Sequence, residues 1–292
     1  MTADRRLLMS IAYRLLGSTS EAEDAVQEAF ARWYAMPVAD RDEITSPVGW
    51  LVTVTTRICL DVLGSARARR ERYVGEWIPE PLPSGLAWTS RTRSDREDDP
   101  LDRVSLDESL NMAMLVVLES MTPAERVSFI LHDVFAYSFA EVGEMVGRTP
   151  QACRQLASAA RRRIGTARRD RVSTAEHARV VAAFQAAVEG GDVGALIQLL
   201  DPNATAIADG GGIVRAAIKP IVGAQAIADY LVNLRRMVPD LHFELTTVNG
   251  RTGMAGVDAA GKTVTVAAIA VADGLVQNLW VVRNPHKLTY WS

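Results

Sequence analysis

Apolar residues recur every three or four positions through residues 1–75, the spacing of helices that each bury one face. Gly17 breaks the first helical run, and Ser20 and Glu23 form a capping-box pattern at the start of the second. A third helix is expected to begin at Pro47, because proline is well tolerated in the first helical turn, and its carboxyl end is rich in arginine. The sequence therefore predicts an all-helical domain over residues 1–75.

Residues 76–104 interrupt this pattern. They contain Pro79, Pro81 and Pro83 and then the mixed-charge run RTRSDREDDP, without the apolar periodicity of a core element. We expect this stretch to be a linker. Helical spacing returns over residues 105–171, which we expect to form a second all-helical domain. Within it, Thr122, Pro123 and Glu125 combine an N-cap, a proline at the first helical position and a capping box, which predicts the start of a helix.

The stretch FAEVGEMVGRTPQACRQLASAARRRI in the second domain predicts a helix-turn-helix. Ser138 and Glu141 can cap a first helix, Gly147 permits a turn, and Thr149 and Pro150 can start a second helix. The apolar residues of the second helix share one face, so the opposite face is polar. Six residues are expected to point outward: Gln151, Arg154, Gln155, Ser158, Arg161 and Arg162.

These outward side chains are of types that bind DNA. Arginine donates two hydrogen bonds to guanine, glutamine pairs twice with adenine, and further arginines bind phosphates. The net charge of the chain is −3, but Arg148 to Arg171 holds eight arginines and a single acid, Asp170. The alternative is a solvated helix end in an ordinary helical hairpin, and the residues alone leave that alternative open.

After Arg171 the pattern changes from helices to strands. Helices are expected over about 176–189, in a short segment up to Leu200, and over AQAIADYLVNLRR. Four strand-like segments follow, separated by NG, AG and DG turns, which is typical of an antiparallel meander. Helices first and strands last predict an α+β domain over residues 176–292, with a curved antiparallel sheet.

Composition and residue spacing argue against several classes of protein. The chain is 48% hydrophobic and 23% charged, and no uninterrupted apolar run of about twenty residues predicts a membrane span. Arg14 interrupts the first apolar run, which we expect to be a folded helix, not a signal peptide. Cys59 and Cys153 form no CxxC pair and the four histidines are scattered, so we expect neither disulfide, metal nor cofactor, and a reducing cytoplasm.

Essentially the whole chain resembles an extracytoplasmic-function sigma factor, the bacterial subunit that directs core RNA polymerase to promoters. SIAYRLLGSTSEAEDAVQEAFARWY and SPVGWLVTVTTRICLDVLGSARARRE resemble sigma region 2, and residues 106–171 resemble region 4. The extension resembles the SnoaL-like branch of the NTF2-like cone folds, which one subgroup carries. Its three motifs are WIPEPL (Trp77 to Leu82), DGGG (Asp209 to Gly212) and NPHKL (Asn284 to Leu288). Ile213 and His286 replace the usual lysine and aspartate of the subgroup, so no charged contact is carried over to them.

The resemblance implies a role for each group of residues. Asp24, Gln27 and Glu28 would bind the clamp helices of the polymerase β′ subunit, whereas a simple surface helix is the alternative. Contacts to the minus-ten element are implied for Arg57, Asp61, Arg67, Arg69 and Arg70. Region 4 would read the minus-thirty-five element with its six outward side chains and bind the β flap. Regulatory contacts are implied for Trp77, Pro79, Pro81, Asp209, Gly210, Gly211, Gly212, Asn284, Pro285, Lys287 and Leu288.

We therefore expect a promoter-specificity subunit, monomeric when free, with a regulatory extension. One alternative is a ligand-sensing helix-turn-helix regulator in which the cone holds a small molecule. The other is an NTF2-like enzyme domain, because Asp209, Tyr230, Asp240 and His242 are types that do acid–base work. The sequence gives no reason for these four to converge, and we predict no catalytic residues.

Overall fold

The computed structural model describes residues 2–70, 73–85, 110–167 and 172–291, without the side chains of residues 2, 3, 66–70, 166 and 167. These residues form two compact units. Of the described residues, the first contains those up to 70, residue 110 and 114–167, and the second contains 73–85, 111–113 and 172–291. Residues 77–83, which we expected to be part of a linker, therefore pack with the carboxyl-terminal unit.

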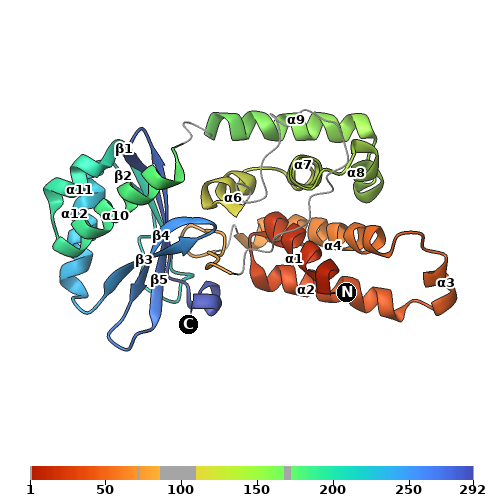
Figure 1. Cartoon of the computed structure of the whole chain (residues 1–292), viewed down its shortest axis with the longest axis horizontal. Coiled ribbons are helices and arrows are strands. Elements are labelled where there is room, and N and C mark those ends of the chain that lie inside the picture. The colour runs from red at the N-terminus through yellow and green to blue at the C-terminus, as the bar shows by residue number, and fades with distance from the viewer. Residues whose placement is uncertain (1, 71–72, 86–109, 168–171, 292) are drawn as a thin grey trace. The chain divides into compact units, whose positions relative to one another are not determined.

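The first unit is all helical, as predicted (Figure 1). We call its amino-terminal part, residues 2–70, the region 2 domain, and residues 112–167 the region 4 domain. The region 2 domain contains α1 (Thr2–Leu16), α2 (Thr19–Ala35), α3 (Val38–Asp42) and α4 (Pro47–Arg70). The region 4 domain contains α6 (Met112–Glu119), α7 (Pro123–Phe129), the π-helical turn η2 (Ile130–Val134), α8 (Phe139–Val146) and α9 (Pro150–Ala167).

Helix starts in this unit follow local capping chemistry. The capping boxes that begin at Thr122 and Ser138 are confirmed. The cap predicted for α2 at Ser20 is wrong by two residues: Ser18 accepts the hydrogen bond instead, from the amide three residues on, at 3.3 Å. Gly17 explains the difference, because its φ of 69° ends α1 and leaves Ser18 as the first residue able to cap α2.

Helix α4 is the one described helix that is long and apolar enough to cross a bilayer, over Pro47–Ser65. Helices in the core of a soluble protein can have the same length and apolar composition. In the structure α4 packs against α1 and α2 and buries Leu51, Val52, Cys59 and Leu63. Its apolar residues are therefore explained by the core of the region 2 domain.

The second unit is an α+β domain, as predicted. Its helices are α10 (Thr174–Gly190), α11 (Val193–Leu199) and α12 (Ala224–Met237). Its strands are β1 (Leu200–Asp209), β2 (Ile221–Val222), β3 (His242–Val248), β4 (Arg251–Val257), β5 (Thr263–Ala272) and β6 (Leu275–Val282), and the short helices η3 (Pro285–Lys287) and η4 (Thr289–Trp291) follow. The strand order is β2-β1-β6-β5-β4-β3.

Strands β3 to β6 form the predicted antiparallel meander. The NG and DG turns are confirmed by positive φ values at Asn249, Gly250, Asp273 and Gly274, as tight hairpins require. Strands β1 and β2 were not predicted. Strand β1 pairs in parallel with β6, so the sheet is mixed, and β2 adds an antiparallel edge.

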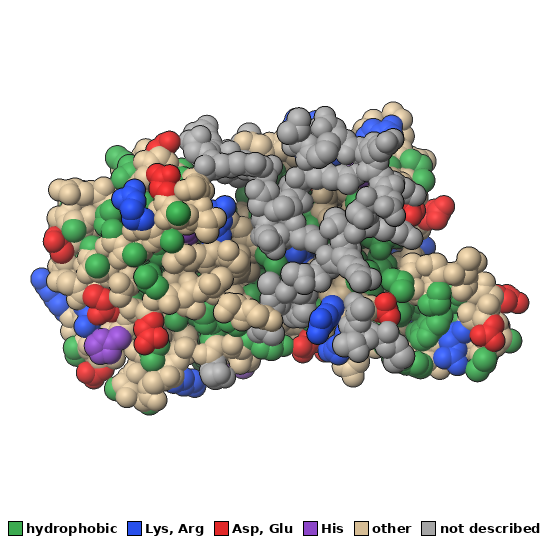
Figure 2. All heavy atoms as spheres, viewed as in Figure 1, with side chains coloured by type: hydrophobic (Ala, Val, Ile, Leu, Met, Phe, Trp, Pro, Cys, Tyr) green, Lys and Arg blue, Asp and Glu red, His purple; other side chains and the backbone are tan. Residues whose placement is uncertain are grey.

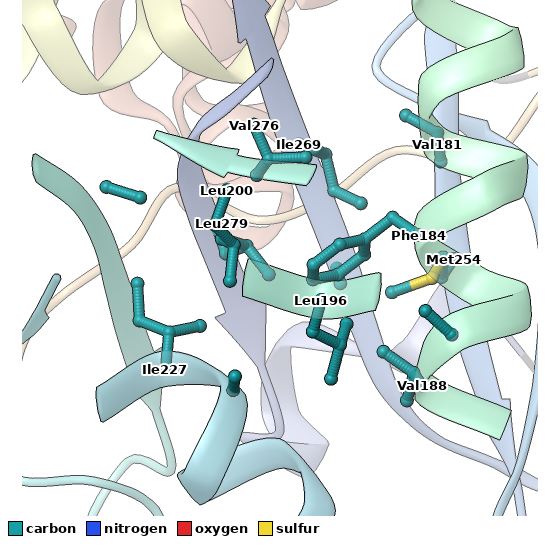
Figure 3. Packing of buried hydrophobic residues seen from close by; sticks show 14 of the residues in the cluster. Val181, Phe184, Val188, Leu196, Leu200, Ile227, Met254, Ile269, Val276 and Leu279 are labelled. Carbon is teal, nitrogen blue, oxygen red and sulfur yellow. The ribbon is translucent and has the colours of Figure 1, made fainter. Parts of the chain in front are cut away.

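Helices α10 to α12 cover one face of the sheet and fill the space beneath them with apolar side chains (Figure 3). Phe184, Leu196 and Ile227 come from the three helices, and Leu279 comes from β6; none is more than 1% exposed. Interiors packed in this way have few voids. A small ligand in the cone would have to displace these side chains.

The opposite face of the sheet is apolar too. Because side chains alternate along a strand, Ala268, Trp280 and Val282 point away from α10 to α12, and all three are buried. Residues 73–85 run along this face (Figure 1), with Ile78 and Leu82 only 1% exposed. The segment therefore forms a third layer, and it contributes apolar side chains to a second core.

Acid should destabilise the carboxyl-terminal unit through His177. This side chain is 3% exposed; its Nε2 lies 2.9 Å from the carbonyl oxygen of Ile269, and its Nδ1 is buried without a described partner. Burial lowers the pKa of His177 below its ordinary 6.5, and nearby Arg251 adds to this. The unfolded chain therefore binds the proton more readily, so the stability is complete above about pH 6.5 and falls as the pH drops below it.

Replacing His177 with glutamine keeps a donor for Ile269 and removes the titration. We expect the melting temperature of the His177→Gln variant to fall less than that of wild type between pH 7.5 and pH 5. Thermal unfolding followed by circular dichroism at several pH values measures this difference. Parallel pH profiles for the two proteins would show that His177 is not the responsible group.

Candidate nucleic-acid interface and linker site

Helices α8 and α9 form the predicted helix-turn-helix. A Cβ atom on Gly143 would lie 2.5 Å from the carbonyl oxygen of Arg148, so only glycine allows the chain to return this closely. Gly147 ends α8 in the left-handed conformation, with φ of 67°. Val142 and Cys153 are fully buried between the helices and their neighbours. The opposite face of α9 is thereby fixed toward solvent.

The six predicted DNA-binding side chains differ in their surroundings. Gln151, Arg154, Gln155 and Arg162 are exposed, whereas Ser158 and Arg161 are half-buried. The guanidinium of Arg154 lies 5.4 Å from the ring centre of Phe139, which supports it by a cation–π contact. Arg161 donates a 2.6 Å hydrogen bond to Asp133, whose side chain is only 2% exposed. Arg161 therefore neutralises a buried acid within the region 4 domain.

The predicted residues of the region 2 domain lie on its surface. Asp24, Gln27 and Glu28 are exposed on one face of α2, and Glu28 pairs with Arg32 at 2.8 Å. Arg57 and Asp61 are exposed on α4. Arg67, Arg69 and Arg70 belong to the last turns of α4, and their side chains lie outside the described residues. Figure 2 shows acidic and basic side chains interspersed over the visible surface.

The carboxylate of Asp209 is the centre of a buried polar site in the carboxyl-terminal unit. Its side chain is fully buried at the end of β1 and accepts four hydrogen bonds. Oδ1 accepts from the Tyr73 hydroxyl at 2.6 Å and from the Gly211 amide at 3.0 Å. Oδ2 accepts from the Ile78 amide at 3.1 Å and from Lys287 Nζ at 2.7 Å. Four donors satisfy this buried charge.

Lys287 connects the site to the linker segment. Its Nζ also donates to the carbonyl oxygen of Ile78 at 2.6 Å and lies 4.1 Å from the ring centre of Trp77 and 5.2 Å from that of Tyr73. The two rings thus form an aromatic cage around a buried ammonium group. Burial, followed by the hydrogen bond to Asp209, raises the pKa of the Tyr73 hydroxyl above its usual range. Tyr73 therefore remains a donor at neutral pH.

The glycine loop and the carboxyl-terminal motif close around the same carboxylate. A Cβ on Gly211, where φ is 63°, would lie 2.4 Å from Asn284 Nδ2. Asn284 Nδ2 in turn donates to the Tyr73 hydroxyl at 2.8 Å. The main-chain oxygen of Asp209 accepts from the amides of Arg283 and Asn284, at 2.8 and 3.0 Å. These contacts explain why small residues are needed beside Asp209.

The remaining predicted regulatory residues lie around this site. Pro79, Pro81 and Leu288 are buried, whereas Pro285 is exposed at the start of η3. Pro81 accepts a 2.9 Å hydrogen bond from Trp291 Nε1. Gly210 and Gly212 are in the loop itself, where a Cβ would meet Val214 and Val74. Ile213 and His286, which replace the usual lysine and aspartate of the subgroup, are exposed. Neither is among the four donors to the Asp209 carboxylate.

Three contributors were missed from the sequence. Tyr73 lies shortly before the WIPEPL motif, separated from Trp77 by Val74, Gly75 and Glu76, and no periodicity marks it. Asn249 was assigned only to a hairpin turn, yet its Oδ1 accepts from the Leu82 amide at 3.0 Å and its own amide donates to the Leu82 carbonyl at 2.9 Å. Trp291 is the third. All three bind the backbone of the linker segment or the buried carboxylate.

Three of the four residues considered for acid–base catalysis, Asp209, Asp240 and His242, do not converge. Asp209 is buried among donors on β1, while Asp240 and His242 are exposed at the start of β3. Four strand spacings separate β1 from β3 in the sheet, which amounts to about 19 Å. His242 instead lies 3.8 Å from Glu189 on the surface. The arrangement therefore does not form one acid–base site.

Comparisons with known proteins match the two helical domains separately and the whole chain together. Residues 1–70 match the family model of Sigma-70 region 2, and residues 111–164 match that of Sigma-70 region 4. The chain is 39% identical to the ECF RNA polymerase sigma factor SigJ of Mycobacterium tuberculosis strain H37Rv, over 98% of this chain and 91% of SigJ. It belongs to the ECF sigma factors. The agreement extends through the carboxyl-terminal unit.

One further relative and one solved structure define how far the similarity of this ECF sigma factor reaches. The probable ECF RNA polymerase sigma factor SigI of Mycobacterium tuberculosis strain CDC 1551 is 39% identical over 69% of this chain and 66% of SigI. The crystal structure of Mycobacterium tuberculosis SigJ matches with a TM-score of 0.74 and 35% identity, covering 99% of this chain and 96% of SigJ. The predicted two-domain helical core with an α+β extension is confirmed.

Removing the partner of Asp209 should release the linker segment. A lone buried charge costs about 3–5 kcal/mol when its partner is deleted, so Lys287→Met should lower the local opening free energy of residues 73–83 by about that amount. The measurement is hydrogen exchange of the Ile78 and Leu82 amides, which both donate to buried side-chain oxygens.

Lys262→Met is the matched control, because Lys262 is exposed in the turn between β4 and β5. It should leave both amides protected. Equal protection in the two variants would mean that the Asp209–Lys287 pair does not hold the segment.

Proposed function

We propose that this ECF sigma factor reads the minus-thirty-five element with α9 and the minus-ten element with α4, and that its extension controls activity through the linker. The observation that supports the first part is the fixed outward face of α9. Gln151, Arg154 and Gln155 are exposed on that face, while Val142, Cys153 and Ala160 are buried. Arginine and glutamine at such positions discriminate guanine and adenine.

Polymerase binding would use the exposed acidic face of α2, formed by Asp24, Gln27 and Glu28, against the β′ clamp helices. The region 4 domain would bind the β flap. Arg57, Asp61 and the arginines at the end of α4 would contact the minus-ten element, where DNA opening costs unstacking energy. Binding of exposed bases and phosphates by the region 2 domain offsets that cost without nucleotide hydrolysis.

Support for the regulatory role comes from the position of the linker segment. Residues 73–83 connect the region 2 domain to the region 4 domain in sequence, yet they are held by Asp209, Asn249 and Lys287 of the extension. The extension thereby fixes part of the chain that joins the two helical domains. A restrained linker limits how both domains can bind one promoter, so we assign the extension an inhibitory role.

Arg154 is the best residue for testing promoter reading. Arg154→Ala should cost about 1–3 kcal/mol of discrimination at one base pair of the minus-thirty-five element. Run-off transcription with purified core polymerase, on promoters substituted one base pair at a time, measures this loss. Only a specificity subunit confers promoter-dependent initiation on core enzyme, so the wild-type reaction also tests the function as a whole.

Arg162→Ala serves as the comparison, because Arg162 is exposed further along α9 and is expected to contact phosphate. It should weaken binding evenly across promoters and lower the salt slope by about one unit. Thermal melts check that loss of the contact between Arg154 and Phe139 does not unfold the domain. Unchanged base discrimination in a folded Arg154→Ala protein would refute the assignment.

A further inference from the structure

Three arginines cross between the region 2 domain and the region 4 domain, which belong to the same compact unit. Arg126 lies on α7 of region 4, whereas Arg14 and Arg57 lie on α1 and α4 of region 2. Each makes contact with the other domain. Two of the three bind the carboxyl end of a helix, where the last main-chain oxygens lack amide partners within the helix.

Arg126 makes the most buried of these contacts. The residue is 2% exposed, and its Nη1 donates to the carbonyl oxygen of Leu15 at 2.7 Å and to Glu119 at 2.8 Å. Leu15 is in the last turn of α1, which ends at Leu16. A cation at this position also interacts favourably with the negative end of the helix dipole. Region 4 thus caps a helix of region 2.

Arg57 makes the reciprocal contact. Its Nε donates to the carbonyl oxygen of Met145 at 3.0 Å, and its Nη2 donates to that of Glu144 at 3.1 Å. Both carbonyls lie in the last turn of α8, the first helix of the helix-turn-helix. Arg14 adds a third contact, because its guanidinium lies 5.5 Å from the ring centre of Phe135 in region 4. Helix α4 also packs along α7 and α8.

We propose that Arg14, Arg57 and Arg126 form a clasp that closes region 2 on region 4 in the free protein and withholds Arg57 from promoter DNA. Two of the five N–H donors of the Arg57 guanidinium, Nε and Nη2, are engaged by α8 in the closed state, so that edge of the group is not available to a phosphate or base there. The masking of Arg57 rests on the proposed function; the clasp itself does not.

The clasp is suited to opening. The Nε of Arg126 is buried without a hydrogen-bond partner among the described residues. An unsatisfied buried donor destabilises the closed state, and opening would let water bind to it. Arg57 is exposed, so its two hydrogen bonds compete with water. A partner that binds the two domains separately can therefore shift the equilibrium to the open state.

The closed state is tested by a distance measurement on the full chain. Cys59 and Cys153 are buried and burial raises the pKa of both thiols, so spin labels attach selectively to new exposed cysteines. Labels at Ala31→Cys and Gln155→Cys report on the two domains by pulsed electron resonance. Wild type should give one narrow distribution, and Arg126→Gln should give a broader one that extends to longer distances.

The control is Arg163→Gln, which removes the same charge and a hydrogen bond to Ser120 within region 4. It should leave the distribution narrow. Phe135→Leu keeps an apolar side chain at a buried position while removing the ring beside Arg14, so it tests the clasp even if Arg126→Gln does not fold. A distribution that stays narrow in the folded clasp variants overturns the clasp.

The masking of Arg57 is tested by fluorescence anisotropy with a 20-nucleotide single-stranded DNA of mixed sequence. If the closed state dominates tenfold, Arg126→Gln should bind about tenfold more tightly than wild type. The gain should disappear in the double variant Arg57→Gln/Arg126→Gln. A broader distance distribution in Arg126→Gln without tighter DNA binding would overturn the masking of Arg57. Failure of wild type to direct transcription would refute the proposed function and leave the distance result unaffected.

Discussion

A single buried carboxylate organises the carboxyl-terminal half of this sigma factor. Asp209 has no access to water, and an ionised group in that position is tolerated only when donors surround it. Its donors come from three separate segments. Tyr73 and Ile78 precede the region 4 domain in sequence, Gly211 follows Asp209 by two residues, and Lys287 lies near the end of the chain. Satisfying one charge therefore joins the linker segment to the extension.

This constraint gives the extension a physical means of acting on the helical domains. The segment it holds lies in sequence between region 2 and region 4, and Ile78 and Leu82 complete an apolar core on the outer face of the sheet. Release of the segment would expose both side chains as well as the ion pair. The reciprocal contacts of Arg57 and Arg126 join the two helical domains through different residues, within the first unit.

Much of this could be predicted because the signals are local. Capping boxes at Thr122 and Ser138, the glycine at the turn of the helix-turn-helix, and the NG and DG hairpins all follow from a few neighbouring residues. The motifs around Asp209 and Lys287 were also identified from the sequence. Their meeting was not, because a buried pair between residues 78 positions apart leaves no periodic pattern.

The elements and contacts that were not predicted also depend on residues far apart in the sequence. Strand β1 contains Pro202 and Asn203 and lacks clear alternation, so its pairing with β6 and β2, and not its own sequence, makes it a strand. Asn249 forms the predicted turn, but its hydrogen bond with the Leu82 amide was not predicted, because Leu82 lies far away in the chain. The DNA contact that the resemblance implies for Arg57 stays a prediction, whereas its hydrogen bonds to α8 were not predicted, because they join residues 88 and 87 positions apart.

The most direct test of the account is run-off transcription by the Asp209→Asn variant with core polymerase. Asparagine keeps the size of the side chain but removes the charge that pairs with Lys287, and Asp273→Asn, in an exposed turn, is the matched control. The account predicts more promoter-dependent transcript from Asp209→Asn than from wild type or Asp273→Asn. Equal transcript from all three proteins would contradict control of the linker by the extension.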